Sequence, residues 1–343
     1  MSFGAYLGGV VGLAAVAIPT GLAAVRLRAR LLPGWEGAPA RLAEAVLGAS
    51  VLTILLQALG AIGVLVPAVL IVAALAVGLT IRFGPWLRPV DAEGEAPPAP
   101  PIPRLETVVA LAAAAFVAAH WATGLQDVWA RGMLTFDTLW YHGPFAARIA
   151  EEGSVWAMHF TDPLYLNWFY PENSELHHGA GIVLFDRDVF SPLINFGWLG
   201  VTFLAAWCVG RPYRVAPLSL AAVAIVMDTG PMVPREAGTA ATDTAPVALL
   251  LAAAAILINA WAGRSAAAGE GVSEARTSAG AGRASETSAV GGALGGALLI
   301  AGLAVGIAVG TKLTVSGAAA VMTAGAPFLV PPGARRRAFL VFL

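Results

Sequence analysis

Long apolar stretches are the feature that most constrains what this chain can fold into. A helix needs about 20 mostly apolar residues to cross roughly 30 Å of hydrocarbon while satisfying its own backbone hydrogen bonds. Such stretches occur at residues 5–25, 41–60, 62–81, 105–124, 191–210, 215–231, 244–262, 291–310 and 314–330. Hydrophobic residues make up 58% of the chain and charged residues only 12%, which argues against a water-soluble domain. We therefore predict an all-α integral membrane protein with about nine transmembrane helices.

The last residues continue the same pattern. Residues 338–343, AFLVFL, are typical of the start of a tenth apolar helix. We therefore expect the chain to stop inside an element, as a fragment of a longer protein would.

The positions of the basic residues predict the orientation, because Lys and Arg near the ends of spans are retained on the cytoplasmic side. With the N-terminus outside, the basic residues fall inside except for Arg131, Arg148, Arg187, Arg235 and Lys312. An inverted topology would reverse this distribution. The Ala-, Gly-, Val- and Arg-rich composition favours a bacterial origin. We expect a multi-pass protein of the bacterial inner membrane, with the C-terminus of this chain in the cytoplasm.

Two polar segments divide the chain. Residues 89–104 are proline-rich and acidic, and residues 263–290 are rich in Ala, Gly and Ser. Both compositions are typical of solvated linkers. We expect the first linker to separate three leading helices in residues 1–88 from a second unit in residues 105–343. The second linker is expected to be a flexible cytoplasmic loop.

Charge and cysteine content exclude several classes of site. The formal net charge is −1, so no basic field points to nucleic acid. Cys208 is the only cysteine, which excludes an intramolecular disulfide and a thiolate zinc site. We interpret Cys208 as a small buried hydrophobic residue and expect membrane lipids, not nucleic acid, among the partners.

Polar and aromatic residues concentrate in the predicted outer loop, residues 125–190. This loop contains four of the five His, three of the five Tyr and four of the ten Trp residues of the chain. Mixed helical periods with Pro and Gly breaks predict two or three short helices lying along the outer membrane surface. We therefore expect the function of the protein to reside in this loop.

Asp137 is the first carboxylate of interest in the loop. Tyr141 follows one helical turn later and shares a helix face with Asp137, and His142 comes next. A carboxylate and a phenol on one face could bind and deprotonate a hydroxyl group. Asp is also a preferred N-cap, so Asp137 could instead cap a helix that begins at Thr138. The spacing leaves both interpretations open.

The order of several motifs resembles the GT-C superfamily, multi-span glycosyltransferases that use polyprenyl-phosphate-linked sugars as donors. The similar motifs are D-x-x-x-Y-H at Asp137, YPENSEL at residues 170–176, the acidic second outer loop PREAGTAATDTAP, and GIAVGTKLT around Lys312. Each motif is degenerate, but their order and shared outer location are more specific. The resemblance covers roughly residues 105–330 and leaves the three leading helices outside.

This resemblance implies that Asp137 is the catalytic base, which takes a proton from an acceptor hydroxyl as that oxygen attacks the anomeric carbon. It also implies cationic partners for the leaving phosphate, for which Lys312 and Arg235 are best placed. The residues expected to bind substrate are Tyr141, His142, Tyr170, Glu172, Glu175, His178, Arg235, Asp243 and Lys312. The implied partners are a polyprenyl-phosphate-linked sugar and a glycan, lipid or protein acceptor, with no cofactor.

Several of these residues also have a structural interpretation. Lys312 would snorkel to the membrane interface. Arg235 would pair with Glu236 or with Asp243, or Asp243 would cap the seventh span. Both sets of interpretations stay open at the level of sequence.

Histidine and tryptophan residues raise the same question. Adjacent His177 and His178 would point about 100° apart on a helix, so we predict no metal site there. His120, inside the fourth span, is interpreted as a hydrogen-bonded core or interface histidine. The tryptophans of the loop would stack on a sugar ring or anchor at the interface, namely Trp140, Trp156 and Trp168.

Two other functions compete with glycosyl transfer. A secondary transporter would place ionisable residues or broken helices near the bilayer midplane. Only Gln57 and Pro67 lie well inside predicted spans, whereas charges collect at the outer rim. A non-catalytic membrane scaffold, whose outer loop only docks a partner, is the second alternative.

Overall fold

The computed structural model describes residues 1–85, 101–156, 158, 169–275 and 283–343, and in these residues every regular element is helical. Six helices contain a stretch long and apolar enough to cross a membrane. They are α1 (Phe3–Leu31), α2 (Gly37–Ala61), α4 (Arg104–Arg131), α7 (Ser191–Gly210), α10 (Thr244–Ala275) and α11 (Arg283–Thr311). The predicted all-α, multi-pass membrane character is confirmed.

Three further apolar helices are shorter than a full span. They are α3 (Pro67–Phe83), α8 (Ala216–Met227) and α12 (Ser316–Gly325), which continues as the 3₁₀ turn η8 (Ala326–Leu329). All nine predicted apolar stretches therefore form helices, but only six of these helices are of spanning length. The count of nine spans stays a prediction.

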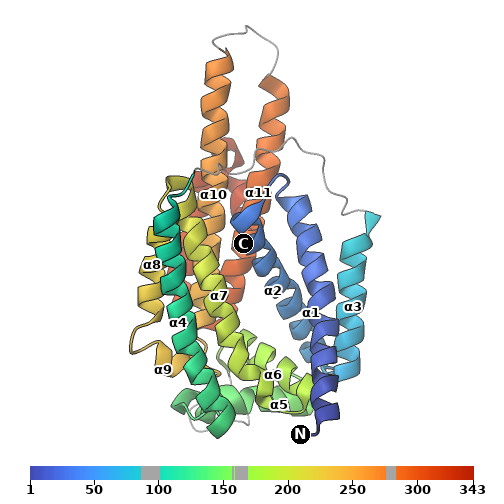
Figure 1. Ribbon diagram of the computed structural model, residues 1–343. Coiled ribbons are helices and arrows are strands. Elements are labelled where there is room, and N and C mark those ends of the chain that lie inside the picture. The colour runs from blue at the N-terminus through green and yellow to red at the C-terminus, as the bar shows by residue number, and fades with distance from the viewer. Residues whose placement is uncertain (86–100, 157, 159–168, 276–282) are drawn as a thin grey trace.

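The second predicted linker, residues 263–290, differs from expectation. Helix α10 continues to Ala275 and α11 already begins at Arg283, so helix occupies most of this segment. Alanine has the highest intrinsic helix propensity, which explains how an Ala-rich segment extends both helices. Figure 1 shows the ends of α10 and α11 projecting together beyond the other helices. Residues 86–100, most of the first predicted linker, lie outside the described part of the chain.

Two of the three leading helices, α1 and α2, pack on helices of the remainder, and α3 packs on α1. The division into two units stays a prediction. One apolar core joins α2 with α7, α10 and α11. Within it, a Cβ atom at Gly296 would lie 2.0 Å from the carbonyl oxygen of Leu31, so only glycine permits this approach of α11 to α1. The Asn259 amide also donates to the carbonyl of Cys208 at 2.8 Å and joins α10 to α7. Cys208 is buried and free, as expected.

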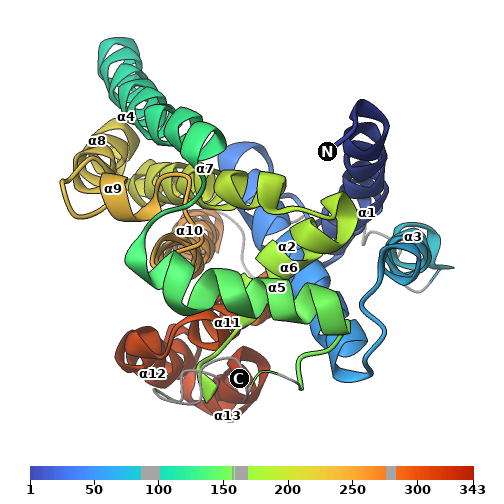
Figure 2. The same cartoon turned by 90° about the horizontal axis from the view of Figure 1, so that it is seen from below.

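Short helices gather at the end of the molecule opposite the projecting tips of α10 and α11 (Figure 1). They are the π-helical turn η2 (Thr138–His142), α5 (Gly143–Glu152), α6 (Asn173–Phe185), the 3₁₀ turn η5 (Asp188–Phe190) and α9 (Val233–Glu236). Seen from this end, α5 lies across the view in front of the longer helices (Figure 2). This arrangement confirms the expected short helices in the loop between α4 and α7. We call it the outer end, following the predicted orientation.

The segment expected to begin a tenth span is also helical. Helix α13 runs from Arg335 to Phe342, and Ala338 and Phe342 are buried in the main apolar core. A Cβ atom at Gly302 of α11 would lie 2.0 Å from the Phe342 carbonyl oxygen. The close contact places α13 directly against α11.

Candidate functional site

Thr138 joins two loops that are far apart in sequence. Its hydroxyl oxygen accepts hydrogen bonds from the backbone N–H of Ala240 at 3.1 Å and from the Thr135 hydroxyl at 2.7 Å. Thr138 is buried, so these bonds are shielded from competing water. They hold the segment that contains Asp137 against the loop that leads into α10.

Asp137 does not cap a helix. Its backbone is already helical, with φ −64° and ψ −35°, and its carboxylate makes no capping hydrogen bond to the π-helical turn that follows. The wider turn is closed by Gly143, whose N–H donates to the Thr138 carbonyl. The capping interpretation is therefore wrong, and the Asp137 side chain is exposed at the outer end.

Tyr141 lies at the centre of the acidic groups of the outer end. Burial raises the pKa of its phenol, and the charges of nearby groups raise it further. In decreasing order of effect, these groups are Asp137, Glu175, Tyr170 and Asp243. The rings of Tyr141 and Tyr170 meet edge to face, with centroids 6.3 Å apart. The phenol therefore stays protonated and can act as a hydrogen-bond donor beside Asp137.

Lys312 and Asp243 form an ion pair at the same rim. Lys312 directly follows the end of α11 and Asp243 directly precedes α10, so the pair joins the outer ends of these two helices. Asp243 is 51% exposed and Lys312 27% exposed, so the pair is partly open to solvent. The ammonium of Lys312 is thereby fixed at the rim instead of extending freely into the interface.

Glu236 caps α10. The backbone N–H and the hydroxyl of Thr244 both donate to Glu236 Oε2, at 3.0 and 2.8 Å. Glu236 is buried, which raises the pKa of its carboxyl against the opposing effect of the Thr244 bonds. The expected capping role of Asp243 is thus taken by Glu236, seven positions earlier in the chain, which the sequence analysis treated only as a partner for Arg235.

Arg235 lies apart from these groups. Its side chain is exposed, and among the described residues it forms an ion pair with neither Glu236 nor Asp243. Both predicted pairings of Arg235 are therefore wrong: Asp243 pairs with Lys312, and buried Glu236 binds Thr244 while Arg235 is exposed. A role for Arg235 toward a phosphate stays a prediction.

Four side chains lie around the start of α6, namely buried His142, Glu175 and His178 and partly exposed His177; we call them the α5–α6 cluster. His142 Nδ1 bonds to Glu175 Oε1, and both side chains are buried. His177 Nε2 lies 3.0 Å from the hydroxyl of Thr53 in α2. These bonds tie η2 and α2 to α6.

Burial sets the protonation of this cluster. It lowers the pKa of His178 to about 3, with smaller effects of neighbouring His177 and His142, and lowers that of His177 to about 4. Burial and the charge of Glu175 raise the pKa of adjacent Glu172 to about 8. The described residues contain no group of three or more His, Cys, Asp or Glu that could hold a metal ion. That His142, Glu172, Glu175 and His178 bind substrate stays a prediction.

The polar residue in the second predicted span, Gln57, is also accounted for. Its amide donates to Asn173 Oδ1 at 2.7 Å, and Asn173 in turn donates to the Ile307 carbonyl at 3.3 Å. This chain of bonds fastens the start of α6 to both α2 and α11. Gln57 therefore has a structural role that its position in a span did not reveal.

The aromatic residues of the loop divide between the expected roles. The indole N–H of Trp156 donates to the Ala61 carbonyl at 2.6 Å, which ties the loop to the end of α2. Tyr170 is partly exposed beside Tyr141. Trp168 lies outside the described residues. Stacking of these rings on a sugar stays a prediction.

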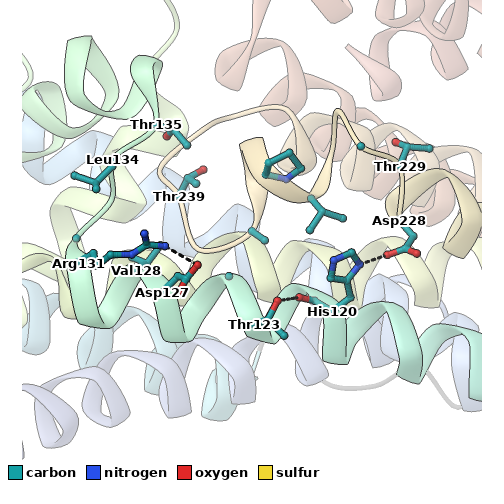
Figure 3. A pocket seen from close by; sticks show the side chains of 16 residues that line it. His120, Thr123, Asp127, Val128, Arg131, Leu134, Thr135, Asp228, Thr229 and Thr239 are labelled. Carbon is teal, nitrogen blue, oxygen red and sulfur yellow. Dashed lines mark hydrogen bonds and ion pairs between the residues drawn. The ribbon is translucent and has the colours of Figure 1, made fainter.

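A cavity of about 590 Å³ lies between α4 and the connection from α8 to α9 (Figure 3). His120 Nδ1 is 2.7 Å from Asp228 Oδ1 at one end of this cavity. His120 is hydrogen-bonded, as expected, but its side chain is 47% exposed and lines a cavity instead of a core. Spacing on α4 offered a signal, because His120, Thr123, Asp127 and Arg131 recur every three to four residues on one face.

Comparison with protein-family models, with curated proteins and with solved structures gives no match to this chain. The chemistry of the outer end must therefore be inferred from its own residues. These provide an exposed carboxylate, a protonated phenol and a paired ammonium at one end of a multi-pass membrane protein.

Proposed function

We propose that this chain transfers a sugar from a polyprenyl-phosphate donor to an acceptor hydroxyl on the outer side of the membrane. The acceptor oxygen forms a bond to the anomeric carbon, and the bond from that carbon to the phosphate oxygen breaks. Polyprenyl phosphate leaves with the electron pair, and the hydroxyl proton passes to Asp137. The acceptor belongs to a glycan, a lipid or a protein of the cell envelope.

The bond between Thr138 and Ala240 is the observation that carries this proposal, because it holds the segment of Asp137 against the loop that ends at Asp243. The charges of Asp137 and Asp243 both raise the pKa of Tyr141, which agrees with this arrangement. Lys312 is bonded to Asp243 and therefore belongs to the same rim. A base and a cation on one side of the membrane are what transfer from an anionic lipid carrier requires.

Asp137 supports the role of base through its exposure. Its carboxylate is not used in capping, so it is free to approach an acceptor hydroxyl. In an oxocarbenium-like transition state the proton leaves late, when the attacking hydroxyl has become strongly acidic. A carboxylate is then a sufficient base.

Lys312 supports stabilisation of the leaving phosphate. A lysine ammonium has three N–H donors, and Asp243 occupies one position beside it. The remaining donors are available to phosphate oxygens as negative charge develops on them. Tyr141 adds a neutral donor because its phenol stays protonated at physiological pH.

The test compares wild type with Asp137→Asn in membranes that receive radiolabelled polyprenyl-phosphate sugars. Loss of a general base typically slows a reaction by about 10²–10⁴-fold, so the variant is expected to form at least about 100-fold less product. Because Asp137 is exposed and makes no cap, the thermal unfolding midpoint should not change.

Asp186→Asn is the matched control. Asp186 is also exposed at the outer end, and its φ of 56° suits asparagine as well as aspartate. Product formation should match wild type in this variant. Equal turnover by wild type and Asp137→Asn would remove Asp137 from the mechanism. Transport of a solute by the wild type without any sugar transfer would favour the transporter alternative.

A further inference from the structure

The cavity beside α4 contains polar groups that the proposed transfer does not use. It is lined by α4, by residues 132–135 and by the segment from the end of α8 to Thr239. The Trp121 indole N–H donates to the Met227 carbonyl at 2.9 Å, and both residues are buried. This bond fixes the end of α8 against α4 and thereby sets Asp228 opposite His120.

Two pairs, each of a basic side chain and a carboxylate, stand at the two ends of this cavity (Figure 3). His120 and Asp228 form one pair at 2.7 Å, and Arg131 and Asp127 form the other at 2.7 Å. Seven residues of α4 separate His120 from Asp127, which corresponds to about 10 Å along the helix. A single small group would therefore not reach both pairs, whereas a ligand of two linked rings would.

The charges of the cavity favour a neutral ligand. Each carboxylate of the lining is bonded to a basic side chain, so each pair offers hydrogen-bond positions without an excess of either charge that an ionic headgroup would require. A hydroxyl group both donates and accepts, and it can therefore bond to both members of such a pair. Further hydroxyl groups line the cavity, from Thr123, Thr135, Thr229 and Thr239.

The helices that form the cavity also present apolar side chains to the membrane. Phe116 precedes His120 by one turn on the same face of α4 and is 66% exposed. Ile225 precedes Asp228 by one turn of α8 and is 71% exposed. A ligand with its polar part in the cavity can therefore extend an apolar tail along α4 and α8.

We propose that this cavity binds the neutral, hydroxyl-rich headgroup of a glycolipid of about disaccharide size. Hydroxyls of the two sugar rings bond to the His120–Asp228 and Asp127–Arg131 pairs, and the lipid tail follows α4 and α8. Thr135 and Thr239 line the cavity and also lie at the junction of the two loops at Thr138. The Thr135 hydroxyl donates to Thr138, and Thr239 directly precedes Ala240, whose N–H also donates to Thr138. Binding of the glycolipid does not depend on the proposed sugar transfer. Only the further step, in which this lipid is the acceptor of the sugar, rests on the proposed function.

The test measures lipid binding to the full chain in phosphatidylcholine nanodiscs by native mass spectrometry. The probes are diglucosyldiacylglycerol, phosphatidylglycerol and phosphatidylethanolamine, and no sugar donor is present, so failure of the transfer reaction does not affect the result. Diglucosyldiacylglycerol should bind about tenfold more tightly than either phospholipid, the effect of one charge-assisted hydrogen bond. Asp228→Asn should remove this preference.

A second variant, Arg131→Gln, tests the cavity without the risk that Asp228→Asn weakens binding only by disturbing the fold. The pair of Arg131 with Asp127 is exposed and contributes little to stability, so this variant keeps the fold while losing donors to the headgroup. It should weaken glycolipid binding several-fold, whereas Asp186→Asn, outside the cavity, should bind as wild type. Tighter binding of phosphatidylglycerol, or unchanged binding by both cavity variants, would overturn the proposal. Equal competition by the soluble disaccharide isomaltose would show that no lipid tail is recognised.

Discussion

The α5–α6 cluster and the outer rim contain the same kinds of side chain in opposite environments. In the cluster, Glu175 is 2% exposed and bonded to buried His142. At the rim, Asp137 is exposed and Asp243 pairs with Lys312 in partial contact with solvent. A carboxylate paired in the interior holds helices together, whereas one at the surface contributes little to stability and stays available to a ligand.

The difference shows that the acidic residues of the outer loop do not all have the same role. The charges of Asp137 and Glu175 both raise the pKa of the Tyr141 phenol. Only Asp137, however, can meet a ligand without displacing packed side chains. Glu175 instead holds His142, at the end of η2, against α6. Stability measurements can therefore separate the two regions.

Glu175→Ala should have the largest effect on folding. It leaves His142 buried without its partner, and an unsatisfied buried polar group typically costs about 1–3 kcal/mol, more where the lost partner is charged, to which the cavity left by the side chain adds. The expected result is a marked fall in the thermal unfolding midpoint of detergent-solubilised protein. Asp243→Ala, the corresponding change at the rim, should cost no more than about 1 kcal/mol. Equal losses in both variants would break the distinction between cluster and rim.

Gly310→Ala should have an intermediate effect. A Cβ atom at Gly310 would lie 2.3 Å from Asn173 Nδ2, so the amide must shift and lose its bonds to Gln57 and to the Ile307 carbonyl. Overpacking of this kind costs about 1–3 kcal/mol. The measurement is again the thermal unfolding midpoint.

Gly306→Ala is the matched control for this prediction. It lies one turn earlier in the same helix, and an added Cβ atom would meet nothing within 4 Å. Because alanine favours helix over glycine, this variant should be unchanged or slightly more stable. A loss of stability at Gly306 as large as that at Gly310 would show that the Asn173 contact is not the cause.

Glu172 should add a smaller, pH-dependent effect. Its pKa is about 8 in the folded protein and 4.5 ordinarily, because burial and Glu175 disfavour its charge. Between these values the folded state binds more protons than the unfolded state, so stability falls as pH rises from about 4.5 to about 8. Glu172→Gln, which cannot ionise, should lack this fall. A constant difference in unfolding midpoint between wild type and variant from pH 5 to pH 8.5 would contradict the prediction.

Wild type must be compared with Glu172→Gln because the nearby histidines change the stability in the opposite direction as pH rises. His177 and His178 are buried in the neutral form, with pKa values of about 4 and 3 against an ordinary 6.5. Their contribution to stability is complete above pH 6.5 and is lost as pH falls toward these values. It is the same in wild type and Glu172→Gln and therefore cancels in the difference.

The sequence alone determined the helical membrane architecture of this protein. Length and continuity of apolar residues are local properties, and a chain that must satisfy its backbone in hydrocarbon has little choice except helix. The short helices of the outer loop followed from local periodicity in the same way. The ends of α10 and α11 were less predictable, because Ala-rich segments suit both a linker and a longer helix.

Tertiary structure alone decided which polar residues meet. His120 and Asp228 are 108 positions apart, and Lys312 and Asp243 are 69 apart. Glu236 replaced Asp243 at the start of α10 for the same reason: a cap or an ion partner is selected by position in space. Periodicity and propensity describe neighbours along the chain, whereas exposure of Asp137, burial of Glu175 and the cavity at His120 depend on how distant helices pack.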